Sequence, residues 1–133
     1  MFENKKRIKT YLETIIKETE LVTEMSKDIN TPNDFLTSIN GLTIFRACGM
    51  SIQFITETLV KIRNLVGMDF FNPYETIPWN ELFGMRNFIS HAYSDVNETY
   101  IFSTVKKDMP SLMVIAQRML DDLNSGKLDE YIQ

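Results

Sequence analysis

The segment GMRNFISHAYSD, Gly84 to Asp95, holds the chain's one histidine, His91, five residues after Arg86. An imidazole titrates near neutral pH, so it can accept or donate a proton in a reaction. An arginine is permanently charged and offers a fork of donors that suits phosphate oxygens. Cleavage of RNA by its own 2′-hydroxyl needs a proton acceptor, a proton donor and a cation beside the phosphorus, and it needs no metal ion. The pair therefore has the chemistry for such cleavage.

A structural role is open for the same residues. A histidine at the end of a helix can interact with the terminal carbonyl groups, and an exposed arginine can form a surface ion pair. Simple binding of a phosphate is a third alternative. The residue types alone leave all three open.

A helix from Pro78 to His91 would fix how these side chains face. Asn87 and His91 are four residues apart and share one side of the helix, and Arg86 and Ser90 share another. Arg86 and His91 are separated by about 140° around the axis. Their tips can converge only at a helix edge, through the reach of arginine, or across a second subunit.

Hydrophobic periodicity predicts the first two helices. Apolar residues at steps of three, four and seven indicate a long amphipathic helix over residues 7–29. Pro32 ends it, and Thr31 can cap a new helical turn that contains this proline. A second helix is predicted from about Leu42 to Val66, with Gly67 as its stop.

Three further helical segments follow a loop with two prolines and several aromatic residues. One helix is predicted from Pro78 to His91, and a D-x-x-E pattern begun by Asp95 starts another at Val96. Met109-Pro110 should break or kink that helix, and residues 110–123 give a fifth. The sequence thus predicts an all-α, up-and-down bundle of four to five helices in one domain, residues 1–133.

Composition sets limits on function. The chain has 133 residues, of which 44% are hydrophobic and 24% charged, which is a globular profile. No apolar run approaches a bilayer span, and no secretory signal or disulfide pair is evident, so we expect a cytoplasmic protein away from membranes. One cysteine and one histidine are a poor zinc inventory, and no metal or cofactor is predicted. The net charge of −4 argues against a general nucleic-acid binder, but it permits a local cationic groove or a basic partner.

The run IPWNELFGMRNFISHAYSDVN resembles the signature of the HEPN superfamily, in the HepT-like branch of ribonuclease toxins that are paired with a minimal nucleotidyltransferase antitoxin. The match consists of Arg86, Asn87, three further residues, His91, Ala92 and Tyr93, preceded by Ile77-Pro78-Trp79. The likeness extends over roughly residues 42–123, including a helix that carries FITETLVKI.

This resemblance implies a helical homodimer in which the motifs of both chains meet in a shared cleft. It also implies a metal-independent endoribonuclease with RNA as the substrate. Arg86 would stabilise the phosphate and the transition state, His91 would be general base or acid, and Asn87 would orient the substrate or the histidine. Glu57 and Ser90 are candidates to line the cleft.

Tyr93 has a regulatory role by the same resemblance. In similar toxins this tyrosine is the acceptor to which the cognate nucleotidyltransferase antitoxin adds AMP. AMP addition two residues from His91 would place negative charge and bulk where RNA must lie. The alternative is an aromatic residue at a helix end with a hydrogen-bonded hydroxyl. For the whole chain, the competing function is a non-catalytic HEPN domain that binds nucleotide or RNA, or docks a nucleotidyltransferase.

Overall fold

The computed structural model describes residues 1–91 and 98–133, and for residues 86–91 it describes the helix backbone without the side chains. The described residues are helical, and no strand occurs among them. In chain order the elements are α1 (Phe2–Met25), η1 (Pro32–Phe35), α2 (Ile39–Val66), η2 (Met68–Phe70), α3 (Trp79–His91), α4 (Glu98–Ser103), η4 (Thr104–Asp108), α5 (Met109–Asn124) and η5 (Asp129–Tyr131). None of the helices in these two ranges is both long and apolar enough to span a membrane.

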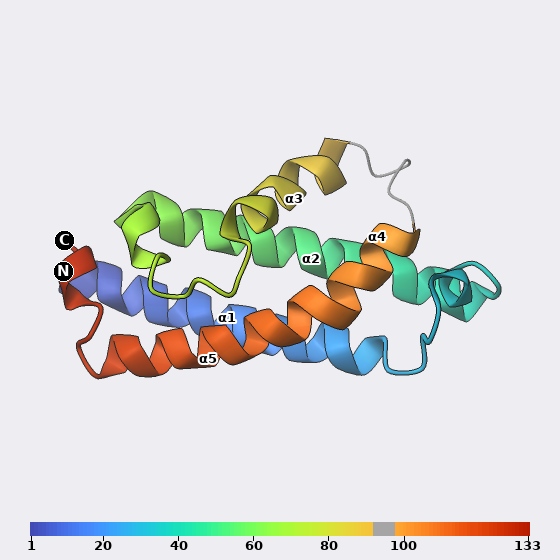
Figure 1. The fold of residues 1–133 in the computed structure, drawn as a ribbon, viewed down its shortest axis with the longest axis horizontal. Coiled ribbons are helices and arrows are strands. Elements are labelled where there is room, and N and C mark those ends of the chain that lie inside the picture. The colour runs from blue at the N-terminus through green and yellow to red at the C-terminus, as the bar shows by residue number, and fades with distance from the viewer. Residues whose placement is uncertain (92–97) are drawn as a thin grey trace.

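The helices form an up-and-down bundle, as predicted. Long helices α1, α2 and α5 lie side by side, α3 packs on α2, and both chain termini lie at one end of the bundle (Figure 1). The apolar residues at three- and four-residue steps face a common core and are almost wholly buried. Representative members are Ile8, Leu12 and Ile15 of α1, Ile52, Ile55 and Leu59 of α2, and Leu112, Met119 and Leu123 of α5.

The first helix lies closer to the N-terminus than the predicted 7–29. It begins at Phe2, and its first turn is held by the C-terminus, because Lys5 forms an ion pair with Asp129 at 2.8 Å. It ends at Met25, after which the Ser26 carbonyl accepts a hydrogen bond of 2.6 Å from Lys106 Nζ. Ile29 is nevertheless 4% exposed, so the apolar pattern continued into a loop that also faces the core.

The turn at Pro32 is a single 3₁₀ turn, η1, with Thr31 as its cap as predicted. The Asp34 carboxylate accepts the backbone N–H groups of Asn30 at 2.8 Å and Thr31 at 3.1 Å, which closes the turn. Helix α2 then starts at Ile39, three residues before the predicted Leu42. Ser38 caps it, because its hydroxyl oxygen accepts the N–H of Gly41 at 2.9 Å.

Of the two predicted effects of Pro110, a break or a kink, the structure shows no break but a distortion of the helix just before the proline. Helix α4, the π-helical turn η4 and α5 follow one another as one rod (Figure 1). Proline lacks an N–H and its ring conflicts with the carbonyl four residues earlier. The π turn widens the helix just before it, and the Met109 N–H bonds to the Thr104 carbonyl, five residues back. The predicted start of this segment at Val96 lies outside the described residues.

Candidate active site at the end of α3

An aromatic cluster fixes α3 on the bundle. The Phe71 ring lies 4.8 Å from the Trp79 ring and 5.3 Å from the Phe83 ring, measured between centroids. Trp79 Nε1 donates to the Tyr74 carbonyl at 2.8 Å. The Arg63 guanidinium of α2 stacks over Phe83, 4.5 Å from the ring centroid. The loop that precedes α3 is therefore tucked onto the bundle, and it holds the first turns of the motif-bearing helix in place.

Helix α3 is described from Trp79 to His91, the last residue before the part of the chain that the structure does not describe. Its backbone therefore puts Asn87 and His91 one turn apart on one side, and Arg86 and Ser90 one turn apart on another. The side chains of these four residues lie outside the described part of the structure, as does the whole of Tyr93. Their roles remain predictions, for which the described structure supplies the helical frame.

Glu57 lies on α2, the helix against which α3 packs. Its side chain is half-buried, and its Oε1 atom accepts a hydrogen bond of 3.2 Å from Gln53 Nε2. This contact orients the carboxylate along α2. The place of Glu57 in a catalytic cleft stays a prediction.

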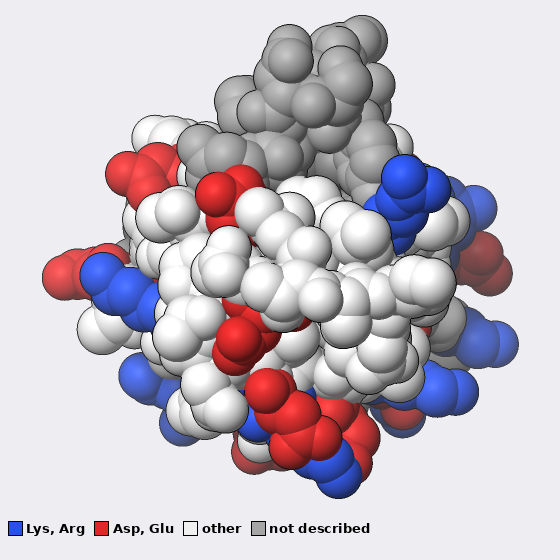
Figure 2. Space-filling view, turned by 90° about the vertical axis from the view of Figure 1, so that its right-hand side faces the viewer, with Lys and Arg blue, Asp and Glu red and all other residues white. Residues whose placement is uncertain are grey.

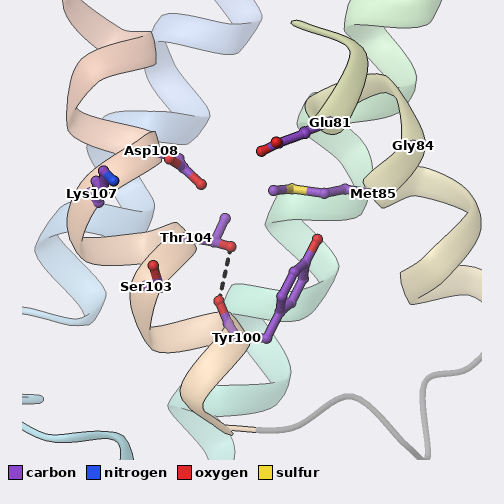
Figure 3. A pocket seen from close by; sticks show the side chains of 8 residues that line it. All are labelled: Glu81, Gly84, Met85, Tyr100, Ser103, Thr104, Lys107 and Asp108. Carbon is purple, nitrogen blue, oxygen red and sulfur yellow. Dashed lines mark hydrogen bonds between the residues drawn. The ribbon is translucent and has the colours of Figure 1, made fainter. Parts of the chain in front are cut away.

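A groove of about 410 Å³ separates α3 from the C-terminal rod. Glu81 and Met85 reach toward it from α3, and Tyr100, Thr104 and Asp108 face them from the rod (Figure 3). A second cavity of about 300 Å³ continues it toward the start of α3. Its lining shares three residues with the first, which are Glu81, Lys107 and Asp108.

The groove changes the acidity of two groups in its wall. Burial raises the pKa of Asp108 above its usual value of 3.8; Lys107 opposes the shift and Glu81 adds to it. Burial also raises the pKa of Tyr100, with smaller contributions from the negative charges of Asp108 and Glu81. Carboxylates, hydroxyls and one ammonium group thus line the groove, which can accept hydrogen bonds from amino groups and donate others to oxygen atoms.

Gly84 leaves part of this groove wall as bare backbone. It lies inside α3 without a positive φ, and a Cβ atom built there would meet no heavy atom of the described structure within 4 Å outside its own stretch of helix. Among the described residues, neither backbone conformation nor packing requires a glycine at this position. Asn87 and His91 follow it by three and seven residues, so their backbone positions lie on the same side of α3. The open backbone is therefore next to the predicted catalytic positions.

The sequence analysis did not identify the groove residues. Glu81 is on the motif helix, but its partners Thr104 and Asp108 are more than twenty residues away, and only the packing of the rod brings them opposite α3. The one local signal was a glycine within a helical segment, which is a feature of close backbone approach.

Comparison with known proteins places the chain among ribonucleases. A family model described as "Ribonuclease HepT-like" matches residues 8–119. The chain is 32% identical over 108 residues to a probable ribonuclease HepT of Thermococcus cleftensis, which covers 81% of this chain and 91% of that protein. It is 29% identical over 109 residues to a putative RNase of Methanocaldococcus jannaschii, covering 82% and 93% of the two chains.

A longer relative shows the same similarity over nearly the whole chain. A gamma-glutamylcyclotransferase and putative RNase of Methanocaldococcus jannaschii is 33% identical over 129 residues, which are 96% of this chain. The match spans 54% of that relative, so this chain corresponds to about half of it. No solved structure matches the chain.

Proposed function

The chain belongs to the HepT-like ribonuclease family and is therefore a ribonuclease, and we propose that it is a metal-independent endoribonuclease. In this proposal RNA is cleaved at a site that two copies of the chain share. The observation that supports this most is the family match across residues 8–119, which contains the complete set Arg86, Asn87 and His91. All three residues lie on the described part of helix α3.

In the proposed reaction a neutral imidazole takes the proton from the ribose 2′-hydroxyl. The 2′-oxygen then attacks the adjacent phosphorus, and the bond from phosphorus to the 5′-oxygen breaks. A protonated imidazole gives its proton to that departing oxygen. The products are a 2′,3′-cyclic phosphate and a free 5′-hydroxyl. Arg86 balances the extra negative charge on the phosphate oxygens, and Asn87 orients the substrate or the histidine.

Two proton transfers call for two proton-carrying groups, and the chain has a single histidine. A homodimer would supply the second imidazole, one from each copy. Arg86 and His91 are about 140° apart around one helix, so they point in different directions within one chain. In a homodimer, Arg86 of one chain could act together with His91 of the other. Glu57 and Ser90 would lie at the edge of that cleft.

We place the enzyme in the cytoplasm as the toxin of a two-gene module, with a minimal nucleotidyltransferase as its antitoxin. Tyr93 would be the acceptor of AMP, since the sequence H-A-Y sets it two residues beyond His91. Each added AMP brings a phosphate charge and a nucleoside next to the RNA path, and both oppose binding of another polyanion. Mass spectrometry after co-expression with the neighbouring gene tests this, and an unmodified Tyr93 peptide would contradict it.

The ribonuclease proposal is tested with purified protein and single-stranded RNA in EDTA. Cleavage that leaves cyclic phosphate ends is expected for the wild type. His91→Ala should lose cleavage while it keeps its helical circular dichroism and its mass in solution. Asn124→Ala, at an exposed position at the end of α5, is the control, and it should retain the activity.

A non-catalytic domain is the second candidate, because the net charge of −4 and the carboxylates of the groove do not favour tight RNA binding. RNA that is bound but left intact, with or without EDTA, would favour this candidate over the nuclease.

A further inference from the structure

One long side of α2 is uncovered and apolar at its centre. Met50 is 70% exposed and Phe54 is 44% exposed, although their neighbours on the opposite side of the helix are in the core. Toward the start of α2, Ile39 at 85% and Leu42 at 42% continue the exposed apolar surface. Contiguous exposed apolar side chains of this size are typical of a protein interface.

The surface extends over the end of the bundle. Figure 2 looks onto the end that carries η1 and the start of α2, and it shows a broad area without charged side chains. The sequence agrees, because no Lys, Arg, Asp or Glu occurs from Phe35 to Phe45. This uncharged stretch includes the exposed polar residues Asn40 and Thr43, and the charged positions on the uncovered side of α2 lie beyond it.

Two of those positions carry opposite charges on either side of the apolar centre. Arg46 and Glu57 are spaced by eleven residues, which is close to three helical turns, so both lie on the side of Met50. Neither forms an ion pair within the described residues. Gln53 lies between them and holds the Glu57 carboxylate through a hydrogen bond of 3.2 Å.

This arrangement is complementary to itself. A two-fold interface requires that residue i of one chain meets residue j of the other, and the reverse. If two α2 helices pack antiparallel about an axis between Met50 and Gln53, Arg46 of each copy lies opposite Glu57 of the other. The same register brings Met50 of one copy near Phe54 of the second, a sulfur–aromatic contact.

We propose that the α2 face formed by Arg46, Met50, Gln53, Phe54 and Glu57 is the surface through which two copies of this chain pair, antiparallel and about a two-fold axis. The pairing covers the exposed methionine and phenylalanine and leaves an ion pair on each side of them. Moving the two-fold axis by about one and a half helical turns, onto Arg46, would bring Leu42 of one copy opposite Met50 of the other, but it would also set the two Arg46 side chains against each other. The charges therefore select the register.

This inference rests on the dimer in the proposed function and states where that dimer forms. Because α3 packs on α2, a two-fold axis at α2 carries both α3 helices with it. The pairing thereby gives each motif a fixed position relative to its copy. It can be tested by mass alone, so its outcome is independent of whether RNA is cut.

The test is the mass of the full chain in solution, measured by light scattering and sedimentation over a range of concentrations. Wild type should have twice the chain mass of 15.5 kDa. Arg46→Glu and Glu57→Arg should each weaken the dimer about tenfold or more, because an attractive pair becomes two like charges. The double variant should recover most of the affinity. Arg7→Glu, on the exposed side of α1, is the control and should change nothing.

Cross-linking gives a second readout that does not depend on charge. A chain with Met50→Cys mixed with a chain with Gln53→Cys should form a disulfide-linked heterodimer. The native Cys48 is wholly buried and its thiol pKa is raised to about 11 by burial, so it should not compete.

Three results would overturn the proposal. They are a wild type that is monomeric at all concentrations, a dimer that tolerates both charge reversals, and single variants that the double variant fails to rescue. An intact dimer without cleavage would instead contradict the ribonuclease proposal alone. Cleavage by a dimer that forms elsewhere would contradict this inference alone.

Discussion

At Gly84, a single added methyl group should raise the stability of the fold and lower the cleavage of RNA. A glycine inside a helix costs about 1 kcal/mol relative to alanine. An added Cβ at Gly84 meets no heavy atom of the described residues within 4 Å beyond its own stretch of helix, so the methyl brings neither a clash nor a packing gain. We therefore expect Gly84→Ala to stabilise the fold by about 1 kcal/mol, which corresponds to roughly 4 °C in Tm for a chain of this length.

The same substitution should reduce RNA cleavage. The open backbone of Gly84 faces the groove between α3 and the rod, on the side of α3 where Asn87 and His91 follow. Backbone without a Cβ atom lets a ligand approach a helix closely, and Gly84 offers such a place beside the predicted catalytic positions. A methyl group there would hold the RNA away from the helix.

Urea unfolding and cleavage of a labelled single-stranded RNA, measured on the same preparation, check both expectations. Gly41→Ala is the contrast, because a Cβ at Gly41 would collide with the Asp34 carbonyl, and it should destabilise by about 1–3 kcal/mol. A less stable Gly84→Ala variant would contradict the inference that the space beside the Gly84 backbone is open. A more stable variant with unchanged cleavage would refute the role of the bare backbone in binding.

Three further expectations follow from contacts elsewhere. The pKa of Asp108 is higher in the folded protein than in the unfolded chain. Between these two pKa values the folded state retains a proton that the unfolded chain releases, so the stability of the fold decreases as the pH rises through this range. Asp108→Asn should thus gain stability over wild type from about pH 4 upward and lose this advantage at lower pH, as urea titrations would show. Tyr74→Phe should cost about 1.5–3 kcal/mol, because it removes the 2.7 Å hydrogen bond that the Tyr74 hydroxyl donates to the Asp122 carboxylate, and an unchanged urea midpoint would contradict this. Cys48, wholly buried with a thiol pKa of about 11, should resist iodoacetamide at pH 8 in the folded protein and react once it is unfolded; rapid labelling without denaturant would contradict this.

Local patterns in the sequence determined which segments are helical. Residues 39–66 and 79–91 follow their predictions closely, because apolar spacing, a capping serine and a terminal glycine act within a few residues of each other. The motif was also local, since Arg86, Asn87 and His91 are read from spacing alone. The ribonuclease family that it suggested is confirmed by the family model.

Interactions between distant segments decided the rest. Helix α1 ends where Lys106, eighty residues away, binds the Ser26 carbonyl. The sequence left open whether Pro110 breaks or kinks its helix, and the structure shows a continuous helix with a π turn before the proline. The groove exists because Glu81 and Asp108 meet across two elements, and the uncovered α2 side appears only once the other helices have taken their places. Sequence fixes local backbone preferences, whereas which side chains meet depends on how the completed helices pack.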